Sequence, residues 1–215
     1  MREITCYLDF ASPYAWLAFA QLPQTLEGVH YHVSYRPVLL GALLKQWGNP
    51  GPAAIAPKRA WLYRHVSWLG QHLGVELQMP ARHPFSSLPL LRLALQCSPA
   101  SGAGAGTINR FVAETVLRHV WQGGHDALDP QRLAELEQRL QPQLRCTLEE
   151  AKALLRSNTE LAAERGVFGV PAFEVDGHVF WGLDSLPMLR ACVQDDPWFT
   201  QHWQALASVE QGLER

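Results

Sequence analysis

The chain has 215 residues, 18% of them charged, and a formal net charge of -2 at pH 7. This length can bury a full hydrophobic core and suits one domain with an insertion, or two small domains. The near-neutral charge excludes a strongly basic field of the kind that binds nucleic acid or an anionic membrane. No apolar run approaches the roughly 20 residues that cross a bilayer. We therefore predict no nucleic-acid partner and no membrane partner.

The cysteines point to a reducing compartment. Cys6, Cys97, Cys146 and Cys192 are widely scattered, and no two of them form a Cys-x-x-Cys pair. Such a pattern is typical of reduced thiols in a cytosol. The first predicted strand begins within a few residues of Met1 and leaves no room for a signal peptide, so we expect a cytoplasmic protein.

The first predicted elements are a short apolar strand over residues 4–8 and a helix that opens at Ser12-Pro13. Ser before Pro is an ordinary N-cap signal, because the hydroxyl accepts a first-turn amide and Pro suits the first helical position. The start of a helix also has unpaired N–H groups and the positive end of the macrodipole, which favour an anion. A capping role and an anion-binding role for Ser12 both remain open on this motif alone.

Residues 39–156 are predicted to be mainly helical. Apolar residues at helical spacing mark helices near 62–73 and 88–95, and apolar residues from 108 to 120 mark a third. Asp129-Pro130 is expected to cap a fourth helix, and Thr147 with Glu150 opens a fifth as a capping box. The Gly- and Ala-rich segment 98–106 is predicted to be a loop.

A second capping box is predicted at Ser157 and Glu160, with a helix that runs to Gly166. Beyond this helix, Val170-Pro171 leads into two short apolar runs separated by an Asp-Gly turn, which is a strong hairpin signal. The peptide before Pro171 is a good candidate for the cis form.

Strand, helix, strand at the start of the chain and helix, hairpin, helix near its end predict an α/β thioredoxin-like fold with a large all-α insertion. We assign residues 1–38 and 157–195 to the split thioredoxin-like domain, 39–156 to the helical insertion and 196–215 to a C-terminal helical tail. The apolar stripe of the tail is expected to pack on its own domain. A thioredoxin-like domain carries Cys-x-x-Cys where this chain has residues 12–15, Ser-Pro-Tyr-Ala. With both sulfurs missing, this position has no dithiol to cycle, so a thiolate must come from elsewhere.

Three segments carry a resemblance to a known family: residues 9–18, Gly48-Asn49 with Lys58, and residues 166–184. They resemble 2-hydroxychromene-2-carboxylate isomerases, which are relatives of kappa-class glutathione transferases in the DsbA-like thioredoxin group. The likeness runs in order and spacing from residue 3 to about residue 193. It implies glutathione as cofactor and Ser12 as the catalytic residue, whose hydroxyl donates to the glutathione sulfur and holds it as thiolate.

The resemblance also implies a reaction, the interconversion of 2-hydroxychromene-2-carboxylate and trans-o-hydroxybenzylidenepyruvate. The thiolate adds to a conjugated double bond, the resulting single bond rotates, and elimination returns glutathione unchanged. A kappa-like glutathione transferase that conjugates small electrophiles and a non-catalytic thioredoxin-like protein are the alternatives. A homodimer is one possible assembly.

Glutathione-binding positions follow from the same resemblance. The backbone of Val170 is expected to pair with the cysteinyl part, and Asp184 to lie near the γ-glutamyl group. Asn49 and Lys58 are expected to provide polar contacts from the other wall. The full set implied is Asn49, Lys58, Val170, Pro171, Asp184 and Ser185.

Several positions depart from the family's usual pattern. Leu183 and Ser185 replace polar neighbours of the aspartate, and Trp61, His65 and Trp68 stand where the family often has Tyr, Asp and Arg. These changes fall at positions expected to hold the ends of glutathione and to select the electrophile.

The expected substrate is a small aromatic or conjugated electrophile. Candidate walls for a flat ring are the aromatic residues Phe10, Tyr14, Trp16, Phe85 and Trp181. Each of these side chains also suits a protein core. Nine histidines are present, but there is no His-x-x-x-His helix motif and no paired Cys ligands, so we predict no metal site.

Overall fold

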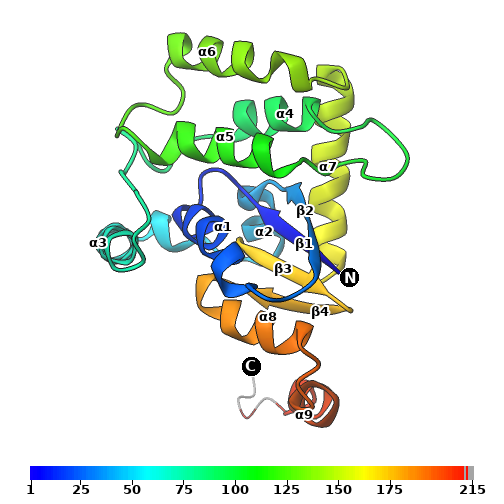
Figure 1. Cartoon of the computed structure of the whole chain (residues 1–215). Helices are drawn as coiled ribbons and strands as arrows, with labels where there is room; N and C mark the ends of the chain where they lie inside the picture. Colours follow the sequence, from blue (N-terminus) through cyan, green and yellow to red (C-terminus); the bar gives the residue numbers. More distant parts are fainter. Residues whose placement is uncertain (211, 213–215) are drawn as a thin grey trace.

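The computed structural model describes residues 1–210 and residue 212 as a four-stranded mixed sheet surrounded by helices (Figure 1). The strands are β1 (Arg2–Leu8), β2 (Tyr31–Pro37), β3 (Ala172–Val175) and β4 (His178–Trp181). Their order in the sheet is β2-β1-β3-β4, with β1 parallel to β2 and antiparallel to β3. The helices are α1 (Pro13–Thr25), α2 (Leu40–Gln46), α3 (Ala56–His72), α4 (Leu88–Gln96), α5 (Arg110–Trp121), α6 (Pro130–Leu140), α7 (Leu148–Glu164), α8 (Leu186–Val193) and α9 (Trp198–Ala207). This arrangement confirms the predicted α/β fold class.

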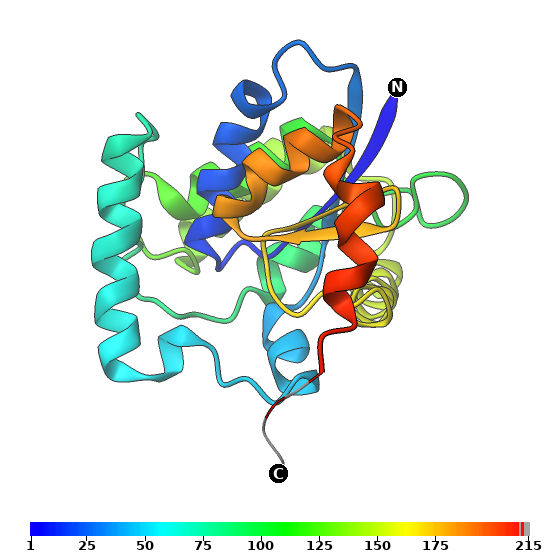
Figure 2. The same cartoon turned by 90° about the horizontal axis from the view of Figure 1, so that it is seen from below.

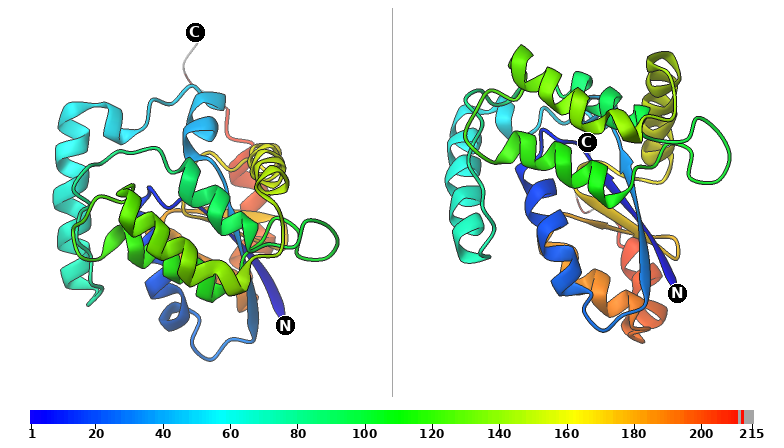
Figure 3. Two further views of the ribbon diagram at one scale, coloured as in Figure 1. Left: turned by 90° about the horizontal axis from the view of Figure 1, so that it is seen from above. Right: turned by 45° about the horizontal axis from the view of Figure 1, so that its top comes forward.

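The helices cover the sheet on several sides. Helices α1 and α8 pack against each other, and α7 contacts β2. Helices α4, α5 and α6 gather together on one side of the sheet, and the loop between α4 and α5 projects from the body of the protein (Figure 3). Seen from below in Figure 2, α3 stands at the side of the protein away from α7. Within the described residues, no helix combines the length and hydropathy needed to cross a bilayer.

One hydrophobic core joins the sheet to the helical segment. Its largest cluster contains Ile4 and Phe19 from the thioredoxin-like part together with Leu90 and Val116 from the predicted insertion. The division of the chain into domains stays a prediction, but apolar packing is continuous across the two parts.

The predicted helix start at Ser157 is wrong. Helix α7 runs without a break from Leu148 to Glu164, and its N-cap is Thr147, which forms a complete capping box with Glu150. Both boxes match the same sequence pattern, but only one can begin a continuous helix. The proposed domain boundary at 156/157 therefore falls inside α7.

The C-terminal part has the hairpin and the packed helix that the sequence predicts. Asp176 and Gly177 have φ angles of 50° and 78°, the left-handed pair that a tight hairpin turn needs. In α9, Phe199 and Trp203 pack on Phe180, so the prediction that the tail packs on its own domain is confirmed for these residues. The predicted tail also includes residues 211 and 213–215, which lie outside the described part.

The buried side chain of Asn158 in α7 gives a test of stability. Its buried amide donates to the carbonyls of Pro37 and Gly106 at 2.9 and 2.7 Å and accepts from Arg36 at 2.7 Å. Because Asn158→Ala leaves these buried partners unpaired, we expect a loss of about 2–4 kcal/mol in the free energy of unfolding, measured by urea denaturation.

The matched control for this test is Ser157→Ala. This exposed neighbour on the same helix should change stability by less than about 0.5 kcal/mol. A cost of about 1 kcal/mol at position 157 would instead support a cap there.

Candidate active site

Ser12 lies where α1 begins, next to the strand-leading Pro171 segment. Its Oγ accepts the N–H of Ala15 at 3.3 Å, so the predicted N-cap is confirmed. The same hydroxyl donates to the carbonyl of Val170 at 3.2 Å. The peptide between Val170 and Pro171 is cis, as predicted. Ser12 is 5% exposed, so the hydroxyl sits at the bottom of a depression rather than on the open surface.

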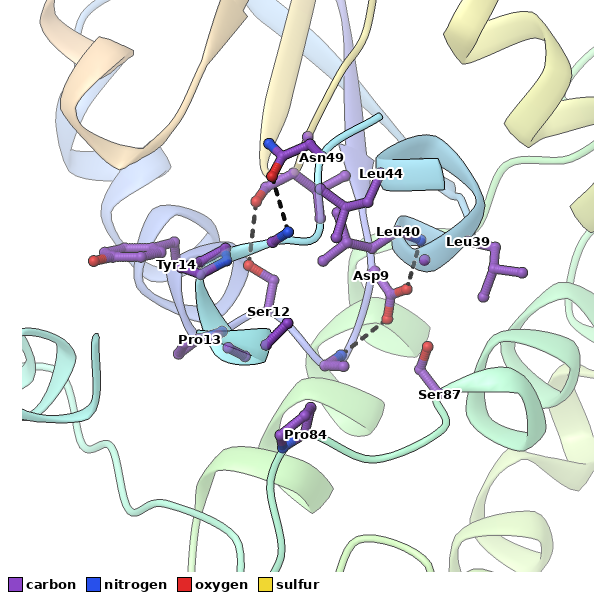
Figure 4. Close-up of a pocket in the computed structure, with 18 of the residues that line it drawn as sticks. Asp9, Ser12, Pro13, Tyr14, Leu39, Leu40, Leu44, Asn49, Pro84 and Ser87 are labelled. Carbon is purple, nitrogen blue, oxygen red and sulfur yellow. Dashed lines mark hydrogen bonds between the residues drawn. The ribbon is translucent and has the colours of Figure 1, made fainter. Parts of the chain in front are cut away.

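Two cavities meet beside Ser12. The first has a volume of about 560 Å³ and is lined by Ser12, Asn49, Phe85 and other residues of the α1 start, α2 and the 83–88 segment (Figure 4). The second has about 620 Å³ and lies between α1, α3 and the start of α8. Tyr14, Val170 and Trp181 line both cavities. Volumes of this size accommodate small organic ligands.

Asp9 forms the polar floor of the first cavity. Its carboxylate accepts the N–H groups of Ala11 at 3.0 Å and of Leu40, the first residue of α2, at 2.9 Å (Figure 4). Burial raises the pKa of Asp9, and the hydrogen bonds from the two amides and from Ser87 work in the opposite direction. The carboxylate is thus used to hold the loop before α1 and the start of α2 in place.

His83 lines the same cavity, and both of its ring nitrogens make polar contacts. Its Nε2 lies 2.9 Å from the carbonyl oxygen of Ala11, so this nitrogen must carry a proton. Nδ1 lies 3.0 Å from the Tyr63 hydroxyl. Burial lowers the pKa of His83, with a smaller opposing effect from the bond to Ala11. Both nitrogens are therefore used in positioning the 83–88 segment.

Tyr14 connects α1 to α3 between the two cavities. Its hydroxyl lies 2.9 Å from Nδ1 of His65. Burial raises the pKa of the Tyr14 phenol, and the negative charge of Asp184 raises it further. His65 is one of the positions that departs from the family pattern, and it lines the second cavity, whereas Trp61 and Trp68 are exposed and line neither cavity.

Most of the predicted glutathione-binding residues come together here. Asn49 lines the first cavity, Pro171 and Asp184 the second, and Val170 both. Lys58 is exposed in the first turn of α3 and lines neither cavity. The remaining member, Ser185, also lies outside both linings and donates its hydroxyl to the carbonyl of Gly182 at 2.8 Å.

The aromatic candidates separate into two groups. Tyr14, Phe85 and Trp181 line the cavities, but Phe10 and Trp16 do not, which corrects the prediction for those two. Phe10 and Trp16 are buried in the core. Phe10 lies on the core side of the turn before α1, and the indole of Trp16 donates to the carbonyl of Glu76 at 2.9 Å.

Sequence reasoning missed several lining residues. Asp9 and Gly169 were named only within the segments that carry the resemblance, and His83 and Ser87 were not predicted. The one available signal was the X-Pro dipeptide at 83–84, whose bond is also cis. Gly169 has a steric role, because a Cβ there would lie 2.7 Å from the indole nitrogen of Trp181.

The sequence profile of the DSBA-like thioredoxin domain matches residues 3–194, nearly the whole chain. The chain belongs to the DSBA-like thioredoxin family. None of its four cysteines, all of them in the described part, lines either cavity. This member therefore keeps the helix-start geometry without a thiol of its own at the site.

Two curated relatives cover most of this chain. The 2-hydroxychromene-2-carboxylate isomerase of Sphingobium xenophagum is 27% identical over 201 residues, which cover 90% of this chain and 99% of the relative. Glutathione S-transferase kappa 1 of Homo sapiens is 26% identical over 214 residues, which cover 87% and 89% of the two chains. A solved structure of a 2-hydroxychromene-2-carboxylate isomerase superposes with a TM-score of 0.68 at 24% identity, covering 96% of this chain and 100% of that chain, and supports the fold.

The lowered pKa of His83 gives a pH prediction. Because the folded-state pKa is below the ordinary value of about 6.5, the unfolded chain takes up a proton more readily as the pH falls. The free energy of unfolding should therefore decrease below about pH 6.5, and His83→Gln should weaken this dependence. Urea denaturation at pH 7.5 and 5.5 measures both slopes. His119 has a lowered pKa for the same reason and leaves a residual slope in the variant. An unchanged slope in the variant would contradict the assignment.

Proposed function

We propose that this protein is a glutathione-dependent isomerase that converts a conjugated double bond of a small aromatic compound between cis and trans. The interconversion of 2-hydroxychromene-2-carboxylate and trans-o-hydroxybenzylidenepyruvate, predicted from the resemblance, belongs to this reaction class. The observation that carries the proposal is the Ser12 hydroxyl, which faces the Val170 carbonyl at the start of α1, where the two cavities meet.

The residues present fit a peptide-like thiol. The second cavity contains Asp184, whose carboxylate suits the amino group of a γ-glutamyl unit, and the backbone of Val170 and Pro171 lies along it. The start of α1 has a first-turn amide at Tyr14 without an intrahelical partner and the positive end of the helix dipole. A sulfur anion is therefore favoured close to Ser12.

Ser12 contributes through its single proton. In the structure this proton is directed to the Val170 carbonyl at 3.2 Å. A hydroxyl rotates easily about its C–O bond, so the same proton can be redirected to a sulfur in the cavity. Donation to the charged form lowers the pKa of the bound thiol, and the helix dipole adds to this effect.

When bound, glutathione supplies the nucleophile: its sulfur adds to the double bond and leaves again after rotation, so that thiol is neither consumed nor oxidised. The chain itself has to hold the electrophile next to that sulfur and limit access of water. Phe85 and Trp181 provide aromatic surface on the first cavity, and Tyr14 is fixed there by His65.

Conjugation by a kappa-like transferase is the second candidate. Trp181 is 54% exposed and lines both cavities, so the region beside Ser12 reaches solvent at this side chain. A conjugate can leave by this route. A non-catalytic thioredoxin-like protein predicts no glutathione affinity, and calorimetric titration with glutathione tests it. The cytoplasmic location and the homodimer stay predictions.

Replacement of Ser12 tests its catalytic role. Ser12→Ala should lower turnover at least tenfold, which corresponds to about 1.4 kcal/mol of barrier, and raise the pKa of bound glutathione. Ser12→Gly should lose the same activity with a smaller loss of stability, because glycine is tolerated as an N-cap. Assays are paired with urea denaturation of each variant. If Ser12→Ala loses stability but keeps its turnover, the residue is only a cap.

The fate of the thiol separates isomerase from transferase. We expect many turnovers for each glutathione, a rate that saturates with glutathione, and no net loss of thiol. Thiol titration alongside chromatography of the products measures this. Disappearance of one thiol for each substrate, with a stable conjugate, would leave the transferase as the function.

A further inference from the structure

The first cavity is mainly apolar. Leucines of the α2 segment form one wall, and prolines and an alanine-rich turn form another. These residues are Leu39, Leu40, Leu44, Pro50, Pro52, Ala53, Ala54 and Pro84. Figure 4 shows Leu40 and Leu44 on the same side of the cavity as Asn49. Such a lining favours an apolar ligand.

In the part of the chain that the structure describes, three ionisable side chains line this cavity. They are the Asp9 carboxylate, the Tyr14 phenol and the His83 imidazole, and among the described residues no Lys or Arg lines either cavity. Burial lowers the pKa of His83, and its Nε2 proton is used by the Ala11 carbonyl. The described lining thus presents the buried Asp9 carboxyl, whose two oxygens accept backbone amides, and no Lys or Arg side chain.

One amide that could attract an anion is already occupied. The first amide of α2, at Leu40, is bonded to the Asp9 carboxylate. The start of α1 lies beside Ser12, where the proposed function places the sulfur anion. A ligand carboxylate in this cavity would lie near the Asp9 carboxyl and the proposed thiolate, with no Lys or Arg in the described lining to pair with its charge, which is unfavourable.

We propose that the first cavity selects uncharged conjugated compounds over carboxylated ones, so that the substrate is a neutral aromatic enone or ester. This inference rests on the proposed function and narrows its substrate class. It departs from the carboxylate-bearing pair implied by the resemblance. Lys58, which the resemblance places near glutathione, lies outside both cavity linings.

The test uses two saturated probes that lack the conjugated double bond to which a thiol would add. These are 4-phenylbutan-2-one, which is neutral, and 2-oxo-4-phenylbutanoate, which differs by a carboxylate in place of a methyl group. Calorimetry with the full chain at pH 7 should show the neutral probe binding at least tenfold more tightly. Equal or tighter binding of the carboxylate would overturn the proposal, and so would failure of both probes to bind at millimolar concentration.

A variant at the edge of the first cavity tests whether the charge preference arises there. Ala54 is exposed and lines the first cavity, so Ala54→Lys should fold normally and place a cation at its edge. It should strengthen binding of the carboxylate at least fivefold and leave the neutral probe unchanged. Ala54→Gln is the uncharged control of similar length. No gain with Lys, or the same gain with Gln, would contradict a charge-based preference in this cavity.

Lys58→Ala tests the opposing view. If the wild type binds the carboxylate well and this variant loses that binding, Lys58 reaches the ligand and the proposal is wrong. We expect Lys58→Ala to change the affinity for both probes less than twofold.

Turnover is measured separately with cis-4-phenylbut-3-en-2-one and cis-2-oxo-4-phenylbut-3-enoate, each corrected for its uncatalysed rate with glutathione. If the neutral compound is isomerised at least tenfold faster than the carboxylated one, both the proposed function and the charge preference are supported. Absence of isomerisation together with tighter binding of the neutral probe would reject the proposed function and retain the charge preference.

Discussion

The hydrogen bond from the Ser12 hydroxyl to the Val170 carbonyl joins two segments that lie 158 residues apart in the chain. Sheet register makes it possible, because the pairing of Tyr7 with Ala172 brings the end of β1 next to the residues that lead into β3. The start of α1 and the backbone before Pro171 therefore face each other. Both cavities open on this junction, so the geometry of the site depends on the pairing of β1 with β3.

Asp9 fixes the other side of the same junction. A buried carboxylate is unfavourable unless hydrogen bonds compensate it, and here both oxygens accept backbone amides, from Ala11 and Leu40. These contacts hold the turn that presents Ser12 and the first residue of α2. The position of the leucine wall relative to the Ser12 hydroxyl thus depends on one charged side chain.

At the helix start where a thioredoxin-like domain has a cysteine, this protein has the Ser12 hydroxyl. The dipole and the free amide favour a sulfur anion regardless of which molecule provides it. In the proposed function the ligand brings the sulfur and the protein provides the proton donor and the apolar space. In our further proposal, the apolar lining of the first cavity, which has no Lys or Arg among the described residues, selects which electrophile enters.

The sequence alone determined the features that depend on near neighbours: the Ser12 cap, the Asp176-Gly177 turn and the succession of strands and helices. Through its resemblance to a known family, the sequence also identified Asn49, Val170 and Asp184, which line the cavities. The tertiary structure decided the rest. Phe10 and Trp16 are core residues, Asp9 and His83 line the first cavity, and α7 continues through Ser157. Caps and turns are set by contacts within a few residues, whereas the face that a side chain buries is set by partners far along the chain.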